Sequence, residues 1–99
     1  MVGPAMLSTD DSQDARWDPD RAGVESASHE MISVVVAAQT AAMRHFTAVG
    51  DTPRVRALAQ QRDATAQLRS SIVGLSTGEL TALMRSLRAT AEQLRADTV

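Results

Sequence analysis

Apolar positions recur every three or four residues over most of this chain, and the spacing predicts helices at about residues 28–49, 53–73 and 77–96. Only short polar stretches, around Gly50 and Gly74, separate these segments. Connections this short favour neighbouring helices that run in opposite directions. We therefore expect an all-α fold, a three-helix antiparallel bundle.

The first helix should begin at Ser26 or Ser28 and end at Gly50. Its apolar stripe consists of Ile32, Val35, Ala42, Phe46 and Val49. The β-branched run at residues 34–36 is also compatible with a short strand. No other segment offers a partner strand, and an unpaired strand would leave its backbone groups without hydrogen bonds. Helix is therefore the prediction here as well.

The second helix carries a strong start signal, because Thr52 can cap it and Pro53 suits the first helical position. Its apolar positions are Val55, Leu58, Leu68 and Ile72. The turns between Leu58 and Leu68 are mostly polar. We expect this helix to present the thinnest apolar face of the three.

The corner before the third helix combines several capping signals. Gly74 is suited to a left-handed turn that ends one helix, and Ser76 with Glu79 has the spacing of a capping box for the next. Leu75 and Leu80 occupy the two positions of a hydrophobic staple. The third helix then carries the clearest apolar stripe of the chain, made of Leu80, Leu83, Met84, Leu87, Ala91 and Leu94.

The first 25 residues differ from the rest in charge. They hold six acidic residues and two arginines, a net charge of −4, whereas the remaining 74 residues carry +2. They show no helical or strand period and offer little to bury. We expect residues 1–25 to form a disordered acidic tail that precedes a helical domain of residues 26–99. Trp17, the chain's only tryptophan, either folds back over apolar surface or anchors a short binding motif.

The composition excludes several kinds of chemistry. The chain has no cysteine, and all ten basic residues are arginine, so thiol and Schiff-base chemistry are ruled out. His29 and His45 lack the convergent donors that a metal site needs. No nucleophile elbow and no glycine-rich phosphate loop is present. We expect no metal, no cofactor and no catalytic activity. No apolar run approaches the ~18 residues of a membrane span, so we also expect a cytoplasmic protein that does not bind a membrane.

The arginines offer one alternative function. Arg54, Arg56, Arg62 and Arg69 lie on the second helix and would suit a small DNA-binding transcription regulator. Arg62 and Arg69 share a helix face, but Arg56 lies off it, and the region's net charge of +2 is small. We therefore prefer to interpret these arginines as solvated residues on the helix flanks or as members of ion pairs within the chain.

The third-helix stripe has two interpretations, because a small core with few aromatic residues is marginal for a single chain of 99 residues. The stripe is either the core of one chain or a seam shared between two. We favour a shared seam, carried by Leu80, Leu83, Met84, Leu87 and Leu94, with Phe46 and Trp17 as further partner-binding candidates. The partner would be a second copy of the chain or another helical protein.

Residues 57–94 also combine features of a known family, namely Gly74-Leu75-Ser76, Glu79-Leu80, Leu83, Leu87 and Leu94. This pattern resembles the C-terminal dimerisation helices of MarR-type transcription regulators. Residues 30–46 would match the N-terminal helix that packs into the same bundle. The winged helix-turn-helix of that family is missing, because only residues 50–53 separate the first two helices. The resemblance thus implies a regulatory dimerisation bundle without the DNA-binding part.

Overall fold

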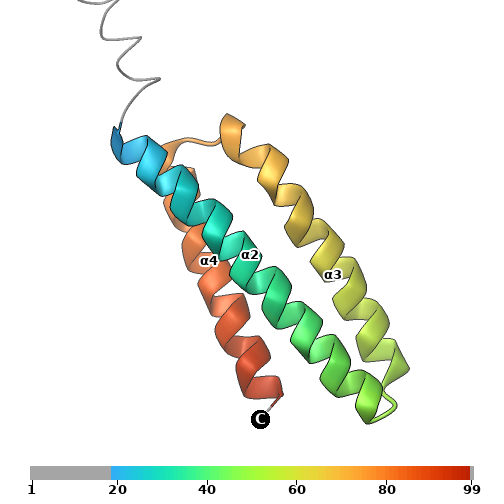
Figure 1. Ribbon diagram of the computed structural model, residues 1–99. Coiled ribbons are helices and arrows are strands. Elements are labelled where there is room, and N and C mark those ends of the chain that lie inside the picture. Colours follow the sequence, from blue (N-terminus) through green and yellow to red (C-terminus); the bar gives the residue numbers. More distant parts are fainter. Residues whose placement is uncertain (1–18, 99) are drawn as a thin grey trace, which may run out of the picture.

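Three long helices and one short 3-10 turn make up residues 19–98, the part of the chain that the computed structural model describes (Figure 1). Helix α2 spans Pro19–Ala48, α3 spans Thr52–Ser71, the 3-10 turn η1 spans Ile72–Gly74, and α4 spans Thr77–Asp97. No strand occurs within residues 19–98, and the run at 34–36 is helical. The all-α helical bundle is confirmed.

Helix α2 begins earlier than predicted. It starts at Pro19, so the predicted boundary is wrong for residues 19–25, which are helical. Arg21 forms an ion pair with Glu25 one turn later, at 2.8 Å, and Val24 packs against the apolar core. Charged residues that look like part of a tail therefore belong to the first two turns of an amphipathic helix. Residues 1–18, including most of the predicted acidic tail and Trp17, lie outside the described part.

Two other capping predictions are corrected. Asp51, not Thr52, caps α3, because its Oδ1 accepts a hydrogen bond from the Arg54 backbone N–H at 3.2 Å. Gly74 does not adopt a left-handed conformation. The chain leaves α3 through η1 instead, where the Leu75 N–H donates to the Ile72 carbonyl at 3.1 Å, so no left-handed residue is required.

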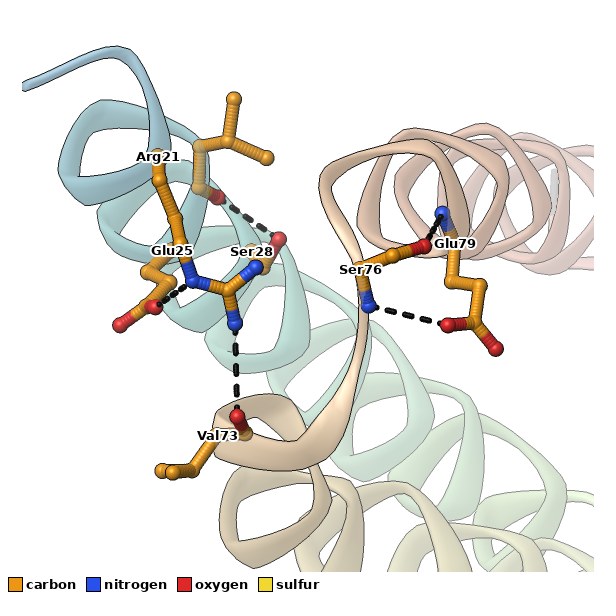
Figure 2. Close-up of polar contacts among 7 residues, drawn as sticks. Arg21, Glu25, Ser28, Val73, Ser76 and Glu79 are labelled. Carbon is orange, nitrogen blue, oxygen red and sulfur yellow. Dashed lines mark hydrogen bonds and ion pairs between the residues drawn. The ribbon is translucent and has the colours of Figure 1, made fainter. Parts of the chain in front are cut away.

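The remaining end signals are confirmed. Gly50 has φ +78°, the left-handed conformation that glycine adopts most easily, and it follows the end of α2. Ser76 Oγ accepts a hydrogen bond from the Glu79 N–H at 3.1 Å, and the Glu79 carboxylate accepts one from the Ser76 N–H at 2.9 Å. Helix α4 therefore starts with the predicted capping box (Figure 2).

The helices are not equivalent in their packing. Helix α2 lies between α3 and α4 and packs along both, while α3 and α4 make almost no contact with each other (Figure 1). One apolar cluster joins α2, η1 and α4 and contains Ile32, Val35, Ile72, Leu80, Leu87 and Ala91. A second, nearer Gly50, joins all three helices and contains Ala42, Phe46, Leu58 and Leu94. Among the described helices, none has the length and hydrophobicity needed to cross a membrane.

Leu87→Ala should lower the free energy of unfolding by about 2–4 kcal/mol, because Leu87 is buried and its removal leaves a cavity between α2 and α4. Urea denaturation followed by far-UV circular dichroism measures this difference. Arg88→Ala, at the exposed neighbouring position, is the matched control and should change stability by less than about 0.5 kcal/mol. Equal effects of the two substitutions would contradict the assignment of Leu87 to the core.

The capping box should make stability depend on pH. Hydrogen bonds from the Ser76 backbone N–H and from the Ser76 side chain hold the pKa of Glu79 below its usual 4.5. A carboxyl group whose pKa is lower in the folded than in the unfolded state stabilises the fold when the pH is above its pKa in the unfolded state. This stabilisation is lost as the pH falls through its pKa in the folded state. The melting temperature of the parent should therefore be higher than that of Glu79→Gln at pH 7. The difference between the two melting temperatures should become smaller below about pH 4.5. A difference that stays constant down to pH 3 would contradict this origin.

Candidate functional site

The leucine stripe of α4 faces the inside of the chain. Leu80, Leu87 and Leu94 are buried, as is Phe46 of α2, and all four belong to the two apolar clusters. Leu83 and Met84 are half-buried, and Leu83 packs against the first cluster. The residues predicted for a shared seam are thus largely covered by the chain's own helices, so a partner has to dock elsewhere unless the bundle opens.

The middle of the contact between α2 and α3 is polar, between the apolar contacts of Leu58 and Leu68. Arg69 Nη2 donates to Ser33 Oγ at 3.2 Å, and Arg62 Nη1 donates to Thr40 Oγ1 at 3.3 Å. Between these two bonds lies the buried pair Gln39 and Thr65. The polar middle of the second helix, noted in the sequence, is therefore a row of hydrogen bonds along α2.

The pair Gln39 and Thr65 leaves one buried atom without a partner. Gln39 Nε2 donates to Thr65 Oγ1 at 3.0 Å, and Thr65 Oγ1 donates in turn to the Gln61 carbonyl at 2.8 Å. Since the hydroxyl has only one hydrogen to give, it can only accept from Gln39. Gln39 Oε1 then has no hydrogen-bond partner within residues 19–98, although Gln39 is only 1% exposed.

The sequence carries a signal for this buried pair. Gln39 lies four residues after Val35 and three before Ala42, on the predicted apolar stripe of the first helix. Thr65 lies seven residues after Leu58 and seven before Ile72, on the corresponding stripe of the second. A polar residue at each of two stripe positions is a pattern that predicts a buried polar contact.

The arginines proposed for nucleic acid do not form one open surface. Arg62 and Arg69 are bound to α2, and the Arg54 guanidinium lies 4.6 Å from the centre of the Phe46 ring, with its Nε 4.0 Å from Asp51. Arg56 is exposed and makes none of these contacts. Three of the four thus make contacts within the chain, although Arg54 and Arg69 remain exposed, as Arg56 does.

The start of α2 is tied to the corner between α3 and α4. Figure 2 shows the Arg21 side chain lying between Glu25 on its own helix and the Val73 carbonyl of η1, to which Nη2 donates at 3.4 Å. One turn on, the Ser28 hydroxyl is buried and donates to the Val24 carbonyl at 2.8 Å. Of these contacts, the bond from Arg21 to the Val73 carbonyl joins two segments that are 52 residues apart in the sequence, and the other two lie within α2.

No group of metal-ligating side chains gathers within residues 19–98. His29 is exposed, and the His45 ring packs edge-on against Phe46 with ring centres 4.9 Å apart. Neither histidine lies beside a nucleophile in a hydrogen-bonded pair.

Two surface grooves within residues 19–98 are lined by side chains from two different helices, and we consider these as candidate binding sites. The first, of about 550 Å³, lies between α3 and α4 and is lined by Gln61, Ser86, Ala89, Thr90, Gln93, Leu94 and Asp97. The second, of about 440 Å³, lies between α2 and α3 near Gly50 and is lined by Thr40, Met43, Arg44, Thr47, Ala48 and Arg62. We name them the α3–α4 groove and the α2–α3 groove. Neither was predicted from the sequence.

Comparison of the chain with protein-family models, with curated proteins and with solved structures finds no match.

Thr65→Val should destabilise the protein by about 1–3 kcal/mol, because it leaves the buried Gln39 amide with no partner. Gln39→Met should cost less than about 1 kcal/mol or be stabilising, since it removes the buried oxygen that lacks a partner while Thr65 keeps its bond to the Gln61 carbonyl. In the double variant most of the Thr65→Val loss should disappear. Additive effects in this double-mutant cycle, measured by urea denaturation, would show that the pair is not coupled.

Proposed function

We propose that this protein is a non-catalytic helical module for protein–protein interaction, and that its partner is a second copy of the same chain. The observation that carries the proposal is the α3–α4 groove. Helices α3 and α4 each pack on α2 but hardly touch each other, and the groove between them is lined by six residues of α4, Leu94 among them, and by Gln61 of α3. Three helices of this kind occupy three corners of a four-helix arrangement and leave the fourth open.

An antiparallel course of α3 along α2 supports this geometry. The hydrogen bond from Arg69 to Ser33 joins the end of α3 to the first half of α2, and the bond from Arg62 to Thr40 joins the middle of α3 to a later turn. Up-and-down neighbours with short connections are typical of four-helix bundles.

The side chains of the groove suit a close helix–helix contact. Ser86, Ala89 and Thr90 are small, and small side chains allow helix axes to approach towards the lower end of the usual 8–10 Å. The polar residues at its edge, such as Gln93 and Asp97, hydrogen-bond to each other at 2.9 Å and do not block it.

The outer surface of α4 favours a second copy as the partner. Ala82, Ala89 and Ala96 are all exposed and recur every seven residues, so one stripe of small side chains follows the helix. A two-fold dimer needs a surface that is complementary to itself, and two such stripes can pack against each other across a symmetry axis.

Ala89→Glu should break the dimer, because two-fold symmetry would bring two carboxylates together in a tight contact, which costs several kcal/mol. Light scattering after size exclusion should give the parent twice the 10.6 kDa of one chain and the variant a single chain mass. Dilution series that span dissociation give the dimer dissociation constants of both proteins. The constant of the variant should exceed that of the parent by at least about tenfold, equivalent to 1.4 kcal/mol.

Ala41→Glu is the matched control, since Ala41 is an exposed mid-helix alanine of α2 that lines neither groove. It should leave the mass of the dimer unchanged. A parent that stays monomeric at high micromolar concentration would disprove self-association. Dissociation by Ala41→Glu but not by Ala89→Glu would place the interface on α2 instead.

A further inference from the structure

The α2–α3 groove combines an apolar floor with two cationic groups. Met43 is half-buried against the second apolar cluster, and Ala48 and the methyl-bearing Thr47 lie beside it. The guanidinium groups of Arg44 and Arg62 line the same groove. Arg62 is held in place by its bond to Thr40, whereas Arg44 is exposed.

This combination suits a large aromatic side chain that is flanked by carboxylates. Arginine stacks on aromatic faces and forms strong hydrogen bonds with carboxylates. Methionine adapts its shape to apolar ligands and makes favourable contacts with aromatic rings. A peptide that carries both an aromatic residue and acidic neighbours would therefore use the floor and the rim at the same time.

The chain itself contains such a segment. Trp17 is its only tryptophan. Asp14 and Asp18 lie within three residues of it, and although Arg16 precedes it, the net charge of the stretch is opposite to that of the groove. We propose that Trp17 and its flanking aspartates dock in the α2–α3 groove of a second copy of the chain.

The geometry of α2 requires a second copy. Trp17 lies two residues before Pro19, the first residue of α2, and can reach only about 7 Å beyond it. The groove begins at Thr40, 21 residues further along the helix, which at 1.5 Å per residue is about 30 Å away. The tryptophan of a chain therefore cannot enter the groove of the same chain, but two chains can exchange these segments reciprocally.

This inference shares with the proposed function the assumption that two copies associate, but it concerns a different surface. The α3–α4 groove would hold two bundles together, and the exchanged segments would add a second contact. The two proposals fail separately, because one is read from the mass of Ala89→Glu and the other from the environment of Trp17.

Trp17 fluorescence of the full-length chain tests the inference, since no other tryptophan contributes. The emission maximum should move to shorter wavelength as the protein concentration rises. Arg44→Glu should abolish the shift, because it places a carboxylate where Asp14 or Asp18 would bind. Arg56→Glu, the same change at an exposed arginine of α3 outside both grooves, should leave the shift intact.

Mixing two variants tests the exchange directly. One chain keeps Trp17 and carries Arg44→Glu, and the other keeps the groove and carries Trp17→Ala. Neither variant alone should show the concentration-dependent shift of the emission maximum. The mixture of the two variants should show this shift. The inference would be overturned by an emission maximum that does not change with concentration, by no recovery in the mixture, or by equal loss with Arg56→Glu.

Discussion

The packing of both α3 and α4 on one central helix is the constraint on which this structure depends. Because the two outer helices hardly touch, both are held by the buried stripe of α2. Ile32 and Val35 of that stripe share one apolar cluster with Ile72 after α3 and Leu80 at the start of α4. The corner between the outer helices therefore meets the central helix where α2 begins, and Arg21 reinforces this junction through the Val73 carbonyl. The α3–α4 groove follows from the same layout, since a closed triangle of helices would have left no space between α3 and α4.

The two contacts of the central helix differ in chemistry. The contact with α4 is built from leucine, isoleucine, valine and alanine, whose burial supplies most of the stabilising free energy in a domain of this size. The contact with α3 contains the arginine bonds to Ser33 and Thr40 and the buried pair Gln39 and Thr65. Hydrogen bonds of this kind add little net stability but require particular partners. They set the register of α3, whereas the apolar contact sets the stability.

Local signals in the sequence predicted much of this fold. Ser76 and Glu79 act within a single turn, so their capping box could be read directly from the spacing, and the same holds for Gly50. The predicted start of α2 is wrong although a local signal exists, because Asp18 followed by Pro19 has the same pattern as Thr52 followed by Pro53. The leucines of α4 were placed correctly on one face, but the spacing of a stripe is the same whether it packs within a chain or between chains. The grooves were not predictable either, since each arises from helices that meet only in the folded chain.

The unpartnered oxygen of Gln39 has a consequence for how the protein moves. A buried amide that is only half satisfied in the closed state gains a hydrogen bond from water whenever α3 lifts away, which lowers the free energy of that opening. The apolar pairing of α2 with α4 gains nothing comparable when it separates. The molecule should therefore divide into two cooperative units, a slowly exchanging pair formed by α2 and α4 and a third helix whose backbone amides exchange with solvent through a separate, lower-energy opening.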